Sequence, residues 1–277
     1  VQPPGDIRNC LAALSTEEPL LTRLFQYRFS AGSGLEGHSF GNLFLSALTA
    51  ITGNFETAIT ASSRVLAVQG QVVPATNVDV RLWAELENGQ RIEGESAIGK
   101  APSPIVRMGC LPEHPPALPR ALEAIANADL IVLGPGSLYT SLLPNLLVPE
   151  LVDAIQKSNS PKLYICNLMT QPGETDGLDV SGHLRAIEAQ LATLGINKKI
   201  FGAVLAQDDM EPSPLIDYYL ARGAEPVICD RRSLKLQGYE VMQAPLQGLR
   251  PTATLRHDPR SLSLAIMRFY RKHKRDT

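Results

Sequence analysis

The pattern of apolar and polar positions changes its character along the chain. In residues 39–51 apolar side chains recur every three or four positions, which predicts an amphipathic helix. The same spacing predicts a helix that begins after Asp6 and further helices over about residues 17–28 and 55–66. We therefore expect the first part of the chain to be helical.

A small antiparallel segment is expected next. Residues 78–86 alternate between apolar and polar side chains, which is typical of a strand with one buried face. Asn88-Gly89 is a dipeptide of tight hairpin turns, and residues 104–111 read as a further strand. We expect a small β-hairpin insertion over about residues 69–111.

From Pro116 onward, helical segments alternate with short apolar runs. Strands separated by helices imply right-handed crossovers and a parallel sheet, and the apolar runs suit strands buried on both faces. The predicted fold class is α/β: a three-layer sandwich of doubly wound character with a mostly parallel sheet. The strands are expected at 129–133, 162–166, 199–205 and 226–229, and the helices at 117–127, 149–157, 181–194 and 213–222.

Composition excludes several classes of protein. A formal charge of -2 and 5% aromatic residues give no field or stacking platform for nucleic acid. The basic end, residues 268–277, is expected to be a solvated helix end. The four cysteines are widely spaced, which fits neither a zinc site nor a secreted disulfide framework. No apolar run reaches the ~18 residues of a membrane span, and no signal peptide is recognisable, so we expect a cytoplasmic protein.

The predicted strand 129–133 runs directly into a loop rich in glycine. Gly134 and Gly136 would let a ligand approach the backbone, Ser137 and Thr140 add hydroxyls, and N–H groups at a helix start bind anions. The Lys-Ser/Thr pair of a nucleoside-triphosphatase loop is missing, and the spacing does not match the dinucleotide fingerprint. A tight turn and a cradle for an anion both remain open.

The loop after strand 162–166 carries six side chains that can form hydrogen bonds within ten residues. A loop that satisfies its own backbone through such side chains is the alternative to a binding site. Because ligands of parallel sheets bind beyond the carboxyl ends of the strands, we expect this loop, the 134–140 loop and the loop after 199–205 to share a crevice. The six side chains belong to Asn167, Thr170, Gln171, Glu174, Thr175 and Asp176.

Polar residues also gather in the predicted helical part. Asp6 could be a plain helix N-cap, and His38 could be a structural histidine. Gly41 and Asn42 are poor choices for a purely structural helix start, so a site that uses the backbone near Gly41 would explain them. The candidate residues here are Asp6, Arg8, Asn9, His38 and Asn42.

Several long stretches resemble one family. They are PPGDIRNCLAAL, GLEGHSFGNLFLSALT, VLAVQGQVVPAT, ADLIVLGPGSLYTSLLPNLLV, ICNLMTQPGETDG and, near the end, LRHDP. They resemble the bacterial gluconeogenesis factor family, the regulatory branch of the superfamily that also holds the 2-phospho-L-lactate transferases. The resemblance implies one CofD-like, Rossmann-like α/β domain over residues 1–277. The implied ligand-binding residues are Asp6, Arg8, Asn9, His38, Asn42, Gly134, Pro135, Gly136, Ser137, Thr140, Asn167, Thr170, Gln171, Glu174, Thr175 and Asp176.

Two functions follow from this resemblance. The first is a cytoplasmic regulator, required for growth and normal cell shape under gluconeogenic conditions, that binds a UDP-sugar without turnover; the sequence shows no nucleophile–base pair and no metal cluster. The second is a transferase that moves a phospho-lactyl-type group from a guanosine diphospho donor to a deazaflavin acceptor, with a divalent metal such as Mg²⁺. Such chemistry rests on positioning and electrostatics, so it needs no nucleophile. We assign no catalytic residue and expect a nucleotide or nucleotide-sugar ligand, no nucleic acid and a homo-oligomer.

The sequence departs from the family pattern at its beginning. The family starts with a strand, a glycine-rich phosphate loop and an aspartate-rich segment, and neither motif occurs here. Val1 is not an initiator residue. We therefore expect a longer natural protein, in which a first β-α unit precedes Val1. Beside strand 129–133 we expect either an open groove or residues from outside this numbering that fill it.

Overall fold

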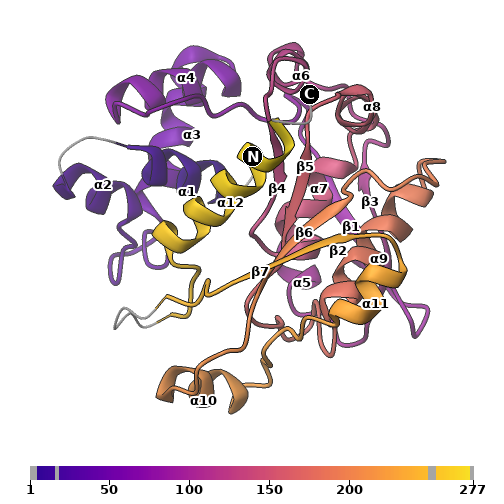
Figure 1. Cartoon of the computed structure of the whole chain (residues 1–277). Coiled ribbons are helices and arrows are strands. Elements are labelled where there is room, and N and C mark those ends of the chain that lie inside the picture. The colour runs from indigo at the N-terminus through magenta and orange to yellow at the C-terminus, as the bar shows by residue number, and fades with distance from the viewer. Residues whose placement is uncertain (1–4, 16–18, 249–253, 275–277) are drawn as a thin grey trace. The chain divides into compact units, whose positions relative to one another are not determined.

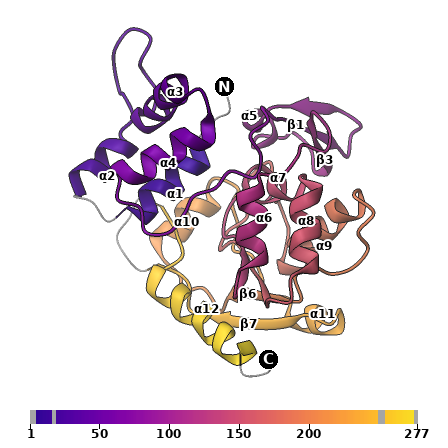
Figure 2. The same cartoon turned by 90° about the horizontal axis from the view of Figure 1, so that it is seen from above.

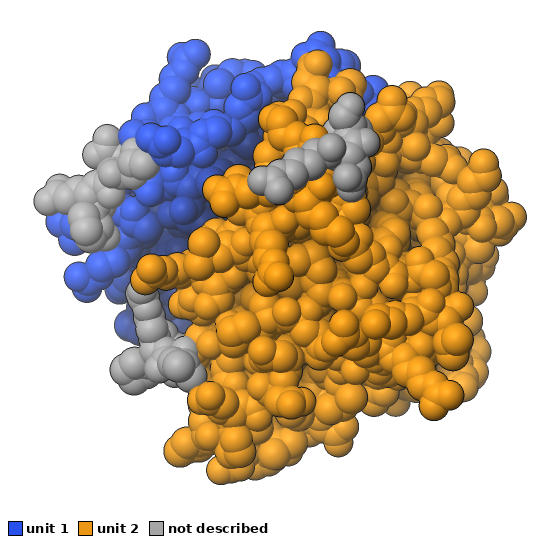
Figure 3. Space-filling view, in the orientation of Figure 1, with its two compact units in different colours: residues 1–80, 115–123 blue, residues 81–114, 124–277 orange. Residues whose placement is uncertain are grey.

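The computed structural model describes residues 5–15, 19–248 and 254–274. The chain divides into two compact units (Figure 3): residues 1–80 with 115–123, and residues 81–114 with 124–277. The prediction of a single domain stays a prediction.

The described part of the first unit is helical, as the spacing of apolar residues predicts. Asn54 caps the last of its long helices by accepting a hydrogen bond from the Thr57 N–H at 3.1 Å, and Gly53 ends the preceding helix in the left-handed conformation, with φ 71°. The buried core consists of Leu11, Ala12, Phe25, Leu45, Ile59 and Leu66. The helices are α1 (Gly5–Leu14), α2 (Pro19–Gln26), α3 (Phe40–Thr52) and α4 (Phe55–Val65) (Figures 1 and 2). A further helix, α6 (Pro119–Ala126), spans the sequence boundary between the units.

The predicted hairpin is present in the second unit as part of a three-stranded antiparallel sheet of order β2-β1-β3. The Trp83 side chain lies flat against Gly109: a Cβ at that position would come within 2.2 Å of the indole ring. The Arg91 guanidinium lies 4.1 Å from the centre of the same ring, and Trp83 is 8% exposed. The strands are β1 (Arg81–Leu86), β2 (Arg91–Glu93) and β3 (Ile105–Leu111), and α5 (Glu95–Ile98) follows β2.

A second sheet, parallel throughout, forms the centre of this unit and has the order β4-β5-β6-β7. On one face Ala265 and Phe269 pack with residues of β5 and β6, so α12 covers that face. Tyr164 and Val204, which alternate with the residues of that face, are also buried, so the other face is covered as well. This confirms the predicted three-layer α/β arrangement. The strands are β4 (Ile131–Leu133), β5 (Lys162–Ile165), β6 (Ala203–Gln207) and β7 (Glu240–Ala244).

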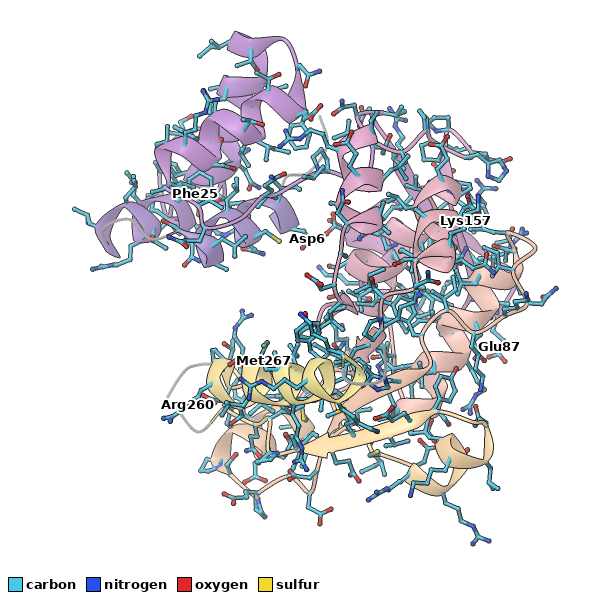
Figure 4. The ribbon with its side chains drawn as sticks, turned by 45° about the horizontal axis from the view of Figure 1, so that its top comes forward. Asp6, Phe25, Glu87, Lys157, Arg260 and Met267 are labelled. Carbon is cyan, nitrogen blue, oxygen red and sulfur yellow. The ribbon has the colours of Figure 1, made fainter. Side chains whose placement is uncertain are left out.

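The remaining helices of this unit connect or cover these strands (Figures 1 and 2). Figure 4 shows Met267, which is 43% exposed, on α12. The remaining helices are η1 (Leu138–Leu142, a π-helix), α7 (Leu143–Leu146), α8 (Pro149–Lys157), α9 (Val180–Ala192), α10 (Pro214–Leu220), α11 (Arg231–Leu236) and α12 (Pro259–Lys274). Within the described residues no helix has both the length and the apolar character needed to cross a bilayer.

The predicted strand at 226–229 is wrong. The fourth strand of the parallel sheet is β7, which follows α11. Pro226 has no N–H to donate to a ladder and forms only an isolated bridge with Met169, while the Val227 N–H donates to the Leu168 carbonyl at 3.0 Å. The apolar run therefore packs against the loop that follows β5, and not in the sheet.

β4 does not fit the prediction of strands buried on both faces. It is an outer strand whose neighbour in the described part of the chain is β5, and Val132 is 38% exposed. Its other backbone edge is not paired with any described strand. The apolar run that contains β4 therefore reflects only partial burial.

His183 on α9 makes the stability of the second unit sensitive to acid. Its side chain is fully buried, Nδ1–H donates to the Asp179 carbonyl at 2.9 Å, and Nε2 has no hydrogen-bond partner among the described residues. Burial lowers the pKa of His183 below its ordinary value of 6.5. The unfolded chain thus binds a proton more readily than the folded chain. The contribution of His183 to the free energy of unfolding is therefore fully present above pH 6.5 and is lost as the pH falls below 6.5.

We therefore expect the free energy of unfolding to fall as the pH drops below about 6.5, by up to about 1.4 kcal/mol per pH unit for this histidine. Urea denaturation across this range measures the slope. The variant His183→Gln should show a shallower slope, because its side chain does not titrate. Parallel slopes for the parent and the variant would contradict the assignment.

Candidate functional site

A cavity of about 610 Å³ lies beyond the carboxyl ends of β4 and β5. This is where parallel sheets usually bind their ligands. The cavity brings together the 134–140 loop and the loop after β5, whereas Asp208 and Asp209, which directly follow β6, do not line it. The lining residues are Pro135, Gly136, Ser137, Asn167, Leu168, Met169, Thr170, Gln171, Tyr219, Leu255, Arg256, His257, Pro259 and Leu262.

Neutral side chains join the two loops. The Gln171 side-chain amide donates to the Ser137 hydroxyl, with 2.8 Å between Nε2 and Oγ. The Asn167 amide lies beside Gln171, with 3.4 Å between Nδ2 and Oε1. These three residues, all predicted ligand contacts, form one hydrogen-bonded cluster on the cavity wall, which we call the amide cluster.

Glu174 connects the same loops from inside the protein. Its side chain is buried; Oε2 accepts the Tyr139 N–H at 3.2 Å and Oε1 accepts the Thr140 hydroxyl at 3.1 Å. Burial raises the pKa of Glu174, while the hydrogen bonds from Thr140 and Tyr139 act in the opposite direction. The carboxyl group thus occupies the start of η1, where helix N–H groups would otherwise attract an anion.

Three other predicted residues use their polar side-chain atoms within the fold. Thr170 Oγ1 accepts the Glu225 N–H at 2.8 Å, Thr175 Oγ1 accepts the Gln171 N–H at 2.8 Å, and Asp176 Oδ2 accepts the Gly173 N–H at 2.7 Å. Of the three, only Thr170 lines the cavity. Thr175 and Asp176 thus satisfy the backbone of their own loop and Thr170 that of Glu225, and Asn167 and Gln171 remain as the side chains that can reach a ligand.

The two glycines of the 134–140 loop have different roles. Gly134 has φ 88°, and a Cβ there would come within 2.8 Å of the Ile165 carbonyl oxygen, so the turn itself requires glycine. A Cβ on Gly136 would have side chains, and not backbone, as its nearest neighbours: the end of Leu142 at 3.1 Å and Ser141 Cβ at 3.6 Å. Because Gly136 lines the cavity, its missing side chain leaves room there.

The sequence reasoning missed the segment that closes another side of the cavity. His257 Nε2–H donates to the Cys166 carbonyl at 3.1 Å, and burial lowers the pKa of His257 so that its imidazole is neutral at pH 7. The Gly248 N–H donates to the Arg256 carbonyl at 2.9 Å, which fixes the segment. The only signal in the sequence was the LRHDP motif, since no periodicity points to these residues. Tyr219 was also missed; its hydroxyl accepts the Leu255 N–H at 3.2 Å.

The candidate residues near the start of the chain lie in the first unit. Arg8 donates to the Ser39 hydroxyl at 2.6 Å and to Asn9 Oδ1 at 3.0 Å, so α1 and the start of α3 are joined. Asp6, which Figure 4 shows on α1, and His38 are exposed, and the buried Oδ1 of Asn42 has no hydrogen-bond partner in the described residues.

Close packing explains the small residue at the start of α3. A Cβ on Gly41 would come within 2.4 Å of the Phe25 carbonyl oxygen and 2.9 Å of Arg8 Cγ. The helices of the first unit therefore require glycine here, whether or not a ligand binds nearby.

The described residues contain no group of three or more His, Cys, Asp or Glu side chains placed to hold a metal ion.

Comparison with known proteins identifies the family. The family model described as 2-phospho-L-lactate transferase CofD matches residues 1–247. A putative gluconeogenesis factor of Nostoc sp. is 53% identical over 98% of this chain, which spans 58% of that protein's length. The gluconeogenesis factor of Bacillus subtilis is 43% identical over 96% of this chain, and the match covers 82% of that protein's length. A crystal structure of a UPF0052 family member from Bacillus halodurans superimposes with a TM-score of 0.88 at 46% identity, covering 96% of this chain and 83% of that one. The chain therefore belongs to the CofD family and is similar over nearly its whole length to proteins named gluconeogenesis factor.

Proposed function

We propose that this protein is a regulatory factor that binds a nucleotide sugar, specifically a UDP-sugar, in the cavity beyond β4 and β5 and does not convert it. The observation that carries the proposal is the make-up of this cavity: a hydrogen-bonded cluster of neutral side chains, one cation and apolar walls in a single space. About 610 Å³ suits a ligand of this size, since small-molecule sites span roughly 300–1,000 Å³. The relatives' names, gluconeogenesis factor, support a role in gluconeogenic growth, and a role in normal cell shape under these conditions is part of the proposal.

Each part of such a ligand finds a suitable group. Arg256 forms no ion pair with a described residue, and a guanidinium binds phosphate oxygens through two parallel hydrogen bonds. Leu168, Met169 and Leu255 supply apolar walls, and the ring of Tyr219 is held by the hydrogen bond between its hydroxyl and the Leu255 N–H. These are surfaces against which a planar base can pack.

A transferase reaction is the second candidate, and the description of the matching family model favours it. In that case a guanosine diphospho donor would occupy the cavity, and a phospho-lactyl-type group would pass to a deazaflavin acceptor. The same cation and hydrogen-bonding groups could position the donor, because transfer at phosphorus depends on positioning and charge. Binding alone does not separate the two candidates, so products must also be analysed.

We expect titration calorimetry to detect binding of UDP-N-acetylglucosamine or UDP-glucose, and weaker or no binding of GDP and NAD. After prolonged incubation the UDP-sugar should be recovered unchanged by chromatography. Failure of every UDP-sugar to bind would refute the proposal. Formation of a phospho-lactyl deazaflavin from the guanosine diphospho donor would establish the transferase instead.

A further inference from the structure

The wall of the cavity differs in polarity from one part to the next. In the amide cluster the Ser137 hydroxyl accepts a hydrogen bond from Gln171, so its own proton is free to be donated. Asn167 Oδ1 has no hydrogen-bond partner in the described part of the chain, so it can accept a hydrogen bond from a ligand. This part of the wall therefore offers both a donor and an acceptor, and it carries no charge.

The buried carboxyl of Glu174 lies near the amide cluster, because it accepts the N–H of Tyr139, two residues after Ser137. The Glu174 N–H donates to the Gln171 carbonyl at 2.9 Å, so the two residues are one turn apart. The Tyr139 N–H and the Thr140 hydroxyl donate to the carboxyl oxygens of Glu174, which suits the ionised form of this group. A second anion beside this group would be repelled, and repulsion is strong where little water screens it. The amide cluster is therefore a poor place for a phosphate.

A phosphate would also leave the acceptor of the cluster unpaired. The oxygens of a diphosphate ester only accept hydrogen bonds at neutral pH, whereas each hydroxyl of a sugar donates and accepts. Only a neutral group with donors of its own can satisfy Asn167 Oδ1 and the Ser137 hydroxyl together. Leaving a polar group unpaired on binding carries a penalty, and binding sites exploit this penalty for specificity.

The cation of the cavity comes from a different segment that lies next to this cluster. His257 is hydrogen-bonded to the carbonyl of Cys166, the residue before Asn167. Arg256, the residue before His257, therefore lines the cavity close to the beginning of the amide cluster, as the adjacent diphosphate and sugar of one ligand require.

We propose that the amide cluster, Ser137, Asn167 and Gln171, binds the neutral sugar of the nucleotide sugar and determines which sugar is accepted, while the diphosphate lies at Arg256. This inference rests on the proposed function. It assigns a sugar, and not a phosphate, to the loop after β4.

The test compares two ligands, UDP-N-acetylglucosamine and UDP, by titration calorimetry on the whole chain. Ser137→Ala and Asn167→Ala should each weaken binding of the UDP-sugar by about 3- to 10-fold and change the affinity for UDP by less than about 2-fold. Arg256→Gln should weaken both ligands by a similar factor. Ser141→Ala is the matched control, because Ser141 lies in the same segment but does not line the cavity. Thermal unfolding of each variant verifies that it folds.

The possible outcomes distinguish a failure of the sugar assignment from a failure of the proposed function. If the parent protein binds UDP-sugar and UDP, but Ser137→Ala and Asn167→Ala weaken both equally, the sugar assignment is overturned and the proposed function stands. Unchanged affinities in both variants overturn the assignment as well. If the parent binds neither ligand, the proposed function fails and the sugar assignment fails with it.

Discussion

Replacement of Gly136 by valine is expected to abolish binding of a UDP-sugar, with a loss of affinity of more than about 100-fold, equivalent to about 2.7 kcal/mol. Gly136 lines the cavity, so the branched side chain would fill space that the ligand needs. The fold should tolerate the change, because the tightest contact of the new Cβ is with the end of the Leu142 side chain, at 3.1 Å, and its contact with Ser141 Cβ, at 3.6 Å, is ordinary. Calorimetry gives the affinity, and thermal unfolding gives the stability of the same sample.

Gly134→Val is the matched control and should behave in the opposite way. With φ 88° and a contact of 2.8 Å to the Ile165 carbonyl oxygen, a side chain at this position strains the backbone itself. We expect this variant to unfold at a much lower temperature. Unchanged affinity in Gly136→Val would show that the loop is only a turn at the end of β4.

Replacement of Glu174 by alanine is expected to destabilise the second unit by about 3–5 kcal/mol. The change leaves the Tyr139 N–H, the Thr140 N–H and the Thr140 hydroxyl without their acceptor, and each unpaired buried polar group costs about 1–3 kcal/mol. The two loops of the cavity would also lose their connection, so ligand affinity should fall. Urea denaturation followed by circular dichroism measures the effect.

Two variants calibrate that result. Thr140→Val removes one hydroxyl and keeps the carboxyl, so it should cost only about 1 kcal/mol. Asp176→Ala removes an exposed carboxylate from the same loop and should have a small effect. If Glu174→Ala were as stable as Asp176→Ala, the carboxyl group would not hold the loops together.

Local patterns were sufficient for most of the elements. The helices of the first unit, the hairpin and the first three parallel strands follow from the spacing of apolar residues and from Asn88-Gly89, because each signal is contained within one element. The shared position of the two loops followed from a general property of parallel sheets. The prediction of a strand at residues 226–229 was wrong because a short apolar run has the same pattern in a strand and in a buried loop.

The sequence could not predict which polar residues of the site face the cavity and which form hydrogen bonds within the fold. Which polar residues of the loop after β5 face the cavity depends on partners such as Glu225 and Tyr139, which are distant in sequence. The contact between His257 and Cys166 spans 91 positions and exists only after the chain has folded. Such pairings depend on tertiary structure, for which one sequence carries no local signal.

Trp83 is the only tryptophan of the chain and lies buried in the small sheet, against Gly109 and beneath Arg91. Tryptophan fluorescence therefore follows the environment of the β1–β3 sheet, while circular dichroism is dominated by helices, four of which lie in the described part of the first unit. Fluorescence thus reports on the second unit alone, whereas circular dichroism reports on the helices of both units. Their transitions coincide only if both units unfold together, so a single denaturation experiment with both detectors reveals whether the units are thermodynamically coupled.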